Sequence, residues 1–237
     1  MLEFERKIDR MAKYKTILFD VDNTLFDFDK DQEIAFKEAM NIIGYPCTEK
    51  MYEDYNQINI GMWEMLNRGE ITAEELSVKR FKIFFEKYQI KQDAQIFSSL
   101  LTQAFQKTGT PIKGSREILE QLKDKYELVI ISNGFKRQQY HRLNNAKFSS
   151  YFSKIFLSEE IGYSKPDKNF FDVVLQNIEN KEKSKILIIG DSISADIAGG
   201  KNAKIDTCWY NPKNKENATN IQPNYEIKDF KELLKII

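Results

Sequence analysis

Two aspartates, Asp20 and Asp22, directly follow a short apolar segment, residues 15–19, that is typical of a buried strand in a parallel sheet. If the strand continued, both side chains would lie on one face. Two carboxylates about 4 Å apart repel each other by about 4 kcal/mol at an effective dielectric constant of about 20. A turn that caps a helix would account for one acid but not for two. A divalent cation and a transferring group between Asp20 and Asp22 would offset this repulsion, so the pair predicts metal-assisted group transfer.

Polar side chains also follow later strands of the predicted sheet. They are Ser132 and Asn133 after the strand 127–131, Lys165 in the loop before Pro166, and Asp191 and Asp196 after the strand 185–189. The carboxyl ends of parallel strands lie along one edge, so these groups can converge on Asp20. Each has an alternative explanation on its own, as a turn, a helix cap or a surface lysine. Their occurrence in this order, at strand ends or in a neighbouring loop, favours one shared site.

The elements around these residues indicate an α/β protein. Strands and helices alternate from about residue 110 onward, which predicts a parallel sheet covered by helices. Between residues 27 and 109 the apolar spacing predicts four helices instead, at 29–43, 48–66, 72–88 and 93–106. We therefore expect an α/β core from 11–26 and 110–237, an inserted all-helical unit at 27–109, and an extension of unknown purpose at 1–10.

Composition argues against several other functions. The 237 residues include 36 basic and 36 acidic ones, so no basic field is present to hold a nucleic-acid polymer. No apolar run is long enough to cross a bilayer, and the amino terminus lacks the apolar segment of a signal peptide. Two cysteines, Cys47 and Cys208, lie far apart and make neither a disulfide framework nor a zinc site. We expect a cytoplasmic protein without a membrane partner, and the oligomeric state stays open.

The ordered motifs resemble those of the haloacid dehalogenase superfamily of aspartate-nucleophile hydrolases. The resemblance runs from about Tyr14 onward and includes all four motifs of that superfamily: Asp20-Val21-Asp22-Asn23-Thr24, Ser132-Asn133, Lys165-Pro166, and Gly190-Asp191-Ser192 with Asp196. One motif alone is weakly specific, whereas the ordered set is strong. The resemblance implies a Rossmann-like parallel-sheet core with a helical C1-type cap domain inserted after the first motif.

The resemblance also implies hydrolysis of a phosphate monoester through an aspartyl-phosphate. Such esters hydrolyse very slowly in water, and a carboxylate nucleophile divides the reaction into two easier steps. Asp20 would be the nucleophile, while Asp22 would protonate the leaving oxygen and then activate water. The implied cofactor is Mg²⁺, which prefers oxygen ligands. Its implied ligands are Asp20, the main-chain carbonyl of Asp22 and Asp191, with Asp196 in the outer shell.

Four residues are implied to surround the phosphoryl group: Thr24, Ser132, Asn133 and Lys165. Ser132, the backbone of Asn133 and Lys165 would donate hydrogen bonds to the oxygens on which charge spreads in the transition state. Thr24 would bond a carboxylate of the first motif.

Several members of the superfamily remain as alternatives. The dehalogenases that named it generally lack an acid two residues after the nucleophile, because a halide leaving group needs no proton. Asp22 therefore favours phosphoryl transfer. Phosphatases of sugars or other small metabolites, and sugar phosphomutases, share the acid pair and stay open as alternatives. A non-catalytic scaffold is disfavoured because no catalytic position has been lost.

Other segments resemble the bacterial pyrimidine 5′-nucleotidases more narrowly. They include Asn133-Gly134-Phe135, Ser158-Glu159-Glu160-Ile161-Gly162, Lys165-Pro166-Asp167-Lys168, Cys208-Trp209, and Trp63 with Gly69-Glu70-Ile71-Thr72. This resemblance implies hydrolysis of a nucleoside 5′-monophosphate to nucleoside and phosphate. In the cap, Asn59, Trp63 and Arg68 are candidates to contact the base or sugar, since an indole face can stack on a base. Packing inside the cap is the stronger alternative for Trp63.

Overall fold

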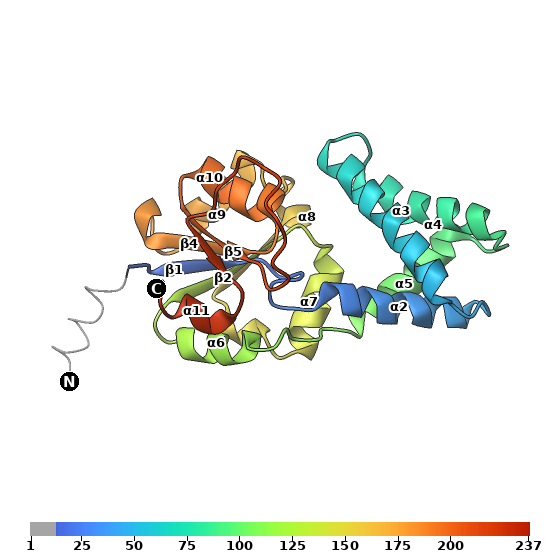
Figure 1. Cartoon of the computed structure of the whole chain (residues 1–237), viewed down its shortest axis with the longest axis horizontal. Coiled ribbons are helices and arrows are strands. Elements are labelled where there is room, and N and C mark those ends of the chain that lie inside the picture. Colours follow the sequence, from blue (N-terminus) through green and yellow to red (C-terminus); the bar gives the residue numbers. More distant parts are fainter. Residues whose placement is uncertain (1–12) are drawn as a thin grey trace. The chain divides into compact units, whose positions relative to one another are not determined.

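Residues 13–237 are described in the computed structural model, and the extension expected at 1–10 lies outside them. Within this range a sheet of six parallel strands has the order β3-β2-β1-β4-β5-β6. Strands β1, β2, β4 and β5 are labelled in Figure 1. The strands are β1 (Thr16–Phe19), β2 (Glu127–Ser132), β3 (Lys154–Leu157), β4 (Ile186–Gly190), β5 (Asp206–Tyr210) and β6 (Tyr225–Ile227). The prediction of an α/β fold with a Rossmann-like parallel sheet is confirmed.

Successive side chains of the strands pack against helices on opposite faces of the sheet. Ile17 and Phe19 of β1 lie in the core of one face, and Leu18 lies in the core of the other. Helices of the first face are α6 (Ser115–Leu122), α7 (Lys136–Asn145) and α11 (Phe230–Leu233), and those of the second are α9 (Lys168–Asn177) and α10 (Ala198–Ala203). Because β1 is covered on both faces, all four of its residues are buried, and residues 17–19 are all apolar.

The carboxyl-terminal region differs from the sequence-based expectation. β6, a strand of three residues, was not expected, because such a short segment shows no recognisable period. It pairs with β5 through Cys208 and Tyr225. The sequence also predicts a terminal helix over residues 228–236, and only the four-residue α11 forms there. The remaining short elements are α8 (Ser158–Ile161), the 3₁₀ turns Ser149–Tyr151 and Lys183–Lys185, and the π-helical turn Ile193–Ile197.

The described chain divides into two compact units. We call Asp29–Thr108 the helical unit, and the described residues up to Phe28 together with Gly109–Ile237 the core unit. The helices before Thr108 are α2 (Phe28–Ile42), α3 (Glu49–Asn67), α4 (Ala73–Tyr88) and α5 (Ala94–Gln106). Each begins and ends within one residue of the helix expected from the sequence.

Capping and aromatic packing explain why the helical unit forms. Thr72 and Glu75 make a capping box at the start of α4, in which each side chain accepts from the other residue's backbone N–H. Inside the unit, Phe36 stacks on Tyr55 with ring centres 4.0 Å apart, and Phe97 contacts Phe36 edge to face. These rings give the unit its own core, independent of the sheet.

The two linkers of the helical unit are bonded to each other within the core unit. Asp27 N donates to Thr110 O, and Ile112 N donates to Leu25 O, both at 2.9 Å. Between them, residues 26 and 111 form an antiparallel bridge. The chain therefore leaves the core unit and returns to it at one place. Within residues 13–237, no helix combines the length and the apolar character needed to cross a membrane.

Candidate active site

The predicted nucleophile, Asp20, lies immediately after β1, the strand that pairs with both β2 and β4. Its main-chain N–H donates to Ile189 O at 2.9 Å, which fixes the backbone of Asp20 against the end of β4. Ser132 ends β2, and Asp191 directly follows β4. Three strand ends that carry polar side chains therefore lie side by side, as the parallel strand order requires.

The loop after β1 brings Thr24 back to Asp20. The carbonyl of Val21 accepts hydrogen bonds from the amides of residues 24–26, which makes this loop compact. Thr24 Oγ1 donates to Asp20 Oδ2 at 3.0 Å and accepts from Asp191 N at 3.1 Å. The predicted bond from Thr24 to a carboxylate of the first motif is confirmed. Because Thr24 is fully buried and engaged in this way, it supports the carboxylate of Asp20 and is not placed to contact a phosphoryl group.

Lys165 lies between two carboxylates and is only 3% exposed. Its Nζ donates to Asp20 Oδ1 at 2.6 Å, to Asp196 Oδ1 at 2.7 Å and to the carbonyl of Ile131 at 3.1 Å. Burial acts against the charged ammonium, but the attraction of Asp196 and Asp20 outweighs it and raises the pKa of Lys165. The structure thus brings the predicted lysine to Asp20 as a fixed cation.

The side chain of Asn133 holds the backbone of Lys165. Asn133 Oδ1 accepts from Lys165 N at 2.8 Å, and Asn133 Nδ2 donates to Lys165 O at 2.9 Å. The sequence suggested a role only for the backbone of Asn133. Its amide group additionally fixes the loop that delivers the lysine to the site.

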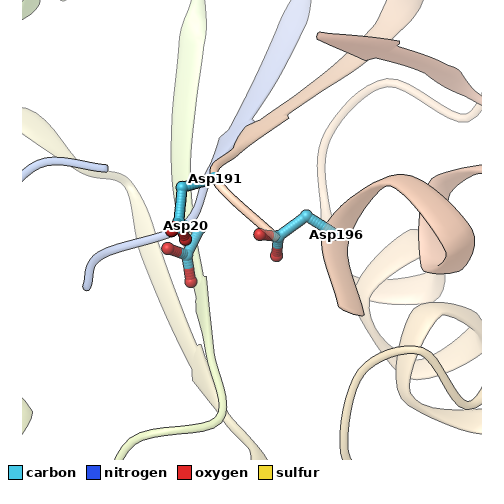
Figure 2. A group of neighbouring side chains, drawn as sticks. All are labelled: Asp20, Asp191 and Asp196. Carbon is cyan, nitrogen blue, oxygen red and sulfur yellow. The ribbon is translucent and has the colours of Figure 1, made fainter. Parts of the chain in front are cut away.

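Figure 2 shows three carboxylates, those of Asp20, Asp191 and Asp196, that converge at this edge of the sheet. One oxygen from each lies within 4.8 Å of the others. Burial raises the pKa of Asp20 to about 7, against the attraction of Lys165. Burial also raises the pKa of Asp191 well above its usual range, and repulsion from the two other carboxylates adds to this shift. Since a divalent cation would offset both effects and Mg²⁺ prefers oxygen ligands, the donor set fits Mg²⁺.

Asp196 is held on both of its carboxylate oxygens. Oδ1 accepts from Lys165, and Oδ2 accepts from the backbone N–H of Ser192 at 3.1 Å. Gly190 makes room for this side chain, because a Cβ at position 190 would lie 2.2 Å from Asp196 Cγ. This arrangement suits the outer-shell position predicted for Asp196.

The second acid, Asp22, lies outside the group of three carboxylates. Its Oδ1 accepts from Arg142 Nη1, and its Oδ2 accepts from Gln139 Nε2 at 2.5 Å. Gln139 Nε2 also donates to Ser132 Oγ at 3.1 Å. One buried amide thus connects the predicted acid with a predicted phosphate-binding hydroxyl.

A comparison with known families agrees with this geometry. The model of the haloacid dehalogenase-like hydrolases matches residues 17–210, a range that includes all four motifs. The chain belongs to this family. The resemblance drawn from the motifs is confirmed, and the chain is a hydrolase of the haloacid dehalogenase type.

Relatives within the family match the chain over almost its whole length. The HAD-hydrolase YfnB of Bacillus subtilis is 34% identical over 96% of this chain and 97% of its own. A crystal structure of YfnB bound to magnesium, which reveals interdomain movement, has a TM-score of 0.91 and covers 94% of this chain and 98% of its own. The pyrimidine 5′-nucleotidases PynA of Streptococcus pneumoniae and YjjG of Escherichia coli are 34% and 30% identical. Their matches cover 93% and 95% of this chain, and 94% and 98% of their own.

Sequence reasoning missed two side chains at the site of this hydrolase, Gln139 and Arg142. Both lie on α7, whose polar sequence is typical of a solvent-exposed helix. In the sequence, only their spacing of three residues, which places both side chains on one helix face, indicated that they act together. Trp209 belongs to a segment that resembles the 5′-nucleotidases, and its Nε1 donates to the carbonyl of Asp191 at 2.9 Å.

The three candidate substrate contacts in the helical unit differ in exposure. Asn59 is 3% exposed, and its amide donates to Gln32 and accepts from Arg80. Asn59 therefore stabilises the interior of the helical unit, and its predicted contact with a substrate is not supported. Arg68 is exposed and ion-paired with a neighbouring glutamate, while Trp63 is half-buried. Only these two stay candidates.

Proposed function

We propose that this chain is a Mg²⁺-dependent phosphatase that hydrolyses pyrimidine nucleoside 5′-monophosphates to nucleoside and phosphate. The environment of Asp20 carries the proposal: this strand-end carboxylate accepts from a buried lysine at 2.6 Å and lies in a group with two other carboxylates. The acid needed for proton transfer, Asp22, is two residues further on. The relatives PynA and YjjG support the choice of substrate, because both are pyrimidine 5′-nucleotidases.

The reaction proceeds in two displacements at phosphorus. Asp20 attacks, the bond to the ester oxygen breaks, and an aspartyl-phosphate forms on Asp20. Asp22 gives its proton to the departing oxygen. Asp22 then takes a proton from water, which attacks phosphorus and releases phosphate from Asp20. One ester and one water thus yield one alcohol and one phosphate, and both aspartates return to their starting states.

Residues beside Asp20 stabilise the charge on the transferring group. Lys165 Nζ already lies at Asp20 Oδ1, so its positive charge is next to the phosphoryl oxygens once phosphorus approaches. Ser132 Oγ accepts hydrogen bonds from Gly134 N at 3.0 Å and from Gln139. Its own proton is then directed to a phosphoryl oxygen.

Asp20, Asp191 and the main-chain carbonyl of Asp22 would hold Mg²⁺, with Asp196 as outer-shell support. When bound, Mg²⁺ neutralises part of the charge shared by the nucleophile and the phosphoryl group. Thr24 keeps Asp20 and the backbone of Asp191 in a fixed relation through its two hydrogen bonds.

We assign the choice of substrate to the helical unit, as a cap domain inserted after the first motif. Trp63 and Arg68 are its remaining candidates to contact the base or the sugar. The partner of the protein is then a small phosphorylated metabolite.

A phosphate-release panel with magnesium tests this function. Uridine and thymidine 5′-monophosphates should exceed adenosine 5′-monophosphate and hexose phosphates by about tenfold or more in kcat/KM, because contacts to the base favour pyrimidines. Release only from hexose phosphates would favour a sugar phosphatase instead. Halide release from 2-haloacids would indicate dehalogenation, and inactivity on the whole panel would indicate a scaffold.

Binding of Mg²⁺ should weaken as the pH falls below about 7, since burial raises the pKa of Asp20 to about 7 and a proton then competes for its carboxylate. The apparent affinity should fall by about tenfold per pH unit for each competing proton and should level off at higher pH. Calorimetric titration with Mg²⁺ between about pH 5.5 and about pH 8 measures this dependence. An affinity that stays constant over that range would contradict the prediction.

A further inference from the structure

Gln139 and Arg142 lie three residues apart on α7 and outside the four motifs of the family. Their exposed fractions are 1% and 0%. Together they hold both carboxylate oxygens of Asp22, with Arg142 Nη1 on Oδ1 and Gln139 Nε2 on Oδ2. Arg142 Nη1 also donates to Gln139 Oε1 at 3.3 Å. The three side chains therefore fix one another.

Packing alone does not explain a buried arginine at this place. A guanidinium loses its hydration on burial and needs a carboxylate partner to offset that cost. The guanidinium carbon of Arg142 also lies 5.1 Å from the ring centre of Phe26 and 5.9 Å from that of Phe28. Both rings belong to the segment that leads into the helical unit. Arg142 thus connects Asp22 with this linker.

Gly134 allows the amide of Gln139 to reach Asp22. A Cβ at position 134 would lie 2.1 Å from Gln139 Nε2 and 2.9 Å from Gln139 Cδ. The same Nε2 donates to Ser132 Oγ. The absence of a side chain at position 134 therefore lets one amide set the separation between Ser132 and Asp22. In our proposal Ser132 donates a hydrogen bond to the phosphoryl group.

We infer that Arg142 and Gln139 are positioning residues for the proton transfers that Asp22 performs. This inference rests on the proposed function, in which Asp22 is the general acid and base. A shift of about 1 Å in a reacting group can cost about 10²-fold in rate, so losing either contact slows the step in which Asp22 protonates the leaving oxygen. Attack by Asp20 is unaffected where the leaving group needs no proton.

The test compares alcohol release in the first turnover from two kinds of substrate. One is p-nitrophenyl phosphate, whose leaving group departs as a stable anion. The other is an alkyl ester, uridine 5′-monophosphate or, if the wild-type protein does not hydrolyse it, ribose 5-phosphate. Arg142→Met and Gly134→Ala should each slow release from the alkyl ester by about 10²-fold and release of nitrophenolate by less than about threefold.

Two comparisons separate positioning from a general loss of structure. Arg137 is an exposed arginine on the same helix, and Arg137→Met should change neither rate. Gly134→Ala keeps the Arg142 side chain and displaces the amide of Gln139 from Asp22, while Ser132 Oγ still accepts from the main-chain N–H of residue 134. It therefore decides the question if Arg142→Met fails to fold.

Variants of Asp22 distinguish this inference from the function on which it rests. Because Arg142 acts through Asp22, the double variant Asp22→Asn/Arg142→Met should be no slower on the alkyl ester than Asp22→Asn alone. Equal slowing of both substrates by Arg142→Met, or additive losses in the double variant, would overturn the positioning role alone. If Asp22→Asn slows release from the alkyl ester no more than release of nitrophenolate, the acid–base assignment fails and the positioning role fails with it.

Discussion

Asp20→Asn should lower phosphate release by at least about 10⁴-fold and leave the fold intact. The asparagine amide has almost the same shape, and its oxygen can still accept from Lys165 Nζ, as Asp20 Oδ1 does at 2.6 Å. Its nitrogen can donate to the hydroxyl of Thr24, which now donates to Asp20 Oδ2. An amide is too weak a nucleophile to form the phosphorylated intermediate. Initial rates with magnesium measure the loss of phosphate release. The intact mass of protein quenched during turnover shows whether the phosphorylated intermediate forms.

A matched control for this variant is Asp124→Asn. Asp124 is exposed and lies between α6 and β2, away from the carboxyl ends of the strands. Its replacement should leave the rate unchanged. A purified Asp20→Asn protein with a rate within tenfold of the wild type would refute the assignment of the nucleophile.

Lys165→Met should impair both catalysis and stability. Methionine fills a similar volume but removes the cation that lies 2.6 Å from Asp20 Oδ1 and 2.7 Å from Asp196 Oδ1. Removing one partner of a buried ion pair costs about 3–5 kcal/mol in the free energy of unfolding. Loss of the charge beside the phosphoryl oxygens should cost about 10²- to 10³-fold in kcat. Denaturant unfolding without metal, and steady-state rates with magnesium, measure these losses.

The pH dependence of Lys165→Met shows whether charge is the cause. Burial raises the pKa of Asp20 to about 7, so below that pH its carboxyl is neutral and has less need of a cation. The stability loss should therefore be smaller in acid than above pH 7. Lys168→Met removes an exposed lysine paired with Asp172 and should have little effect at any pH. An unfolding free energy of Lys165→Met equal to that of the wild type would contradict the buried-pair account.

The sequence predicted the parts of the fold that local patterns determine. Residues 17–19 of β1 are all apolar because the strand is covered on both faces, and the first acidic motif follows it without a gap. The capping box of Thr72 and Glu75 marks the start of α4 directly. Motifs at strand ends could be assigned to one site because parallel strands end at the same edge.

Other parts depend on contacts that no local pattern reveals. Arg142 lies in a polar helix, and its burial follows from Asp22, 120 residues earlier in the chain. Asn59 is polar and lies on a helix of the helical unit, which by itself favours a substrate contact, but Gln32 and Arg80 engage its amide. In both cases a tertiary partner decides the role of a side chain whose type alone indicates exposure.

The pairing of the two linkers has a consequence for how this architecture can diversify. Asp27 and Thr110 meet at hydrogen-bond distance, so the segment between them begins and ends at one point on the core. An insertion with adjoining ends can be lengthened, shortened or exchanged without displacing a strand. The acidic edge of the sheet can then stay constant over evolutionary time while the segment inserted at this junction changes in length and sequence.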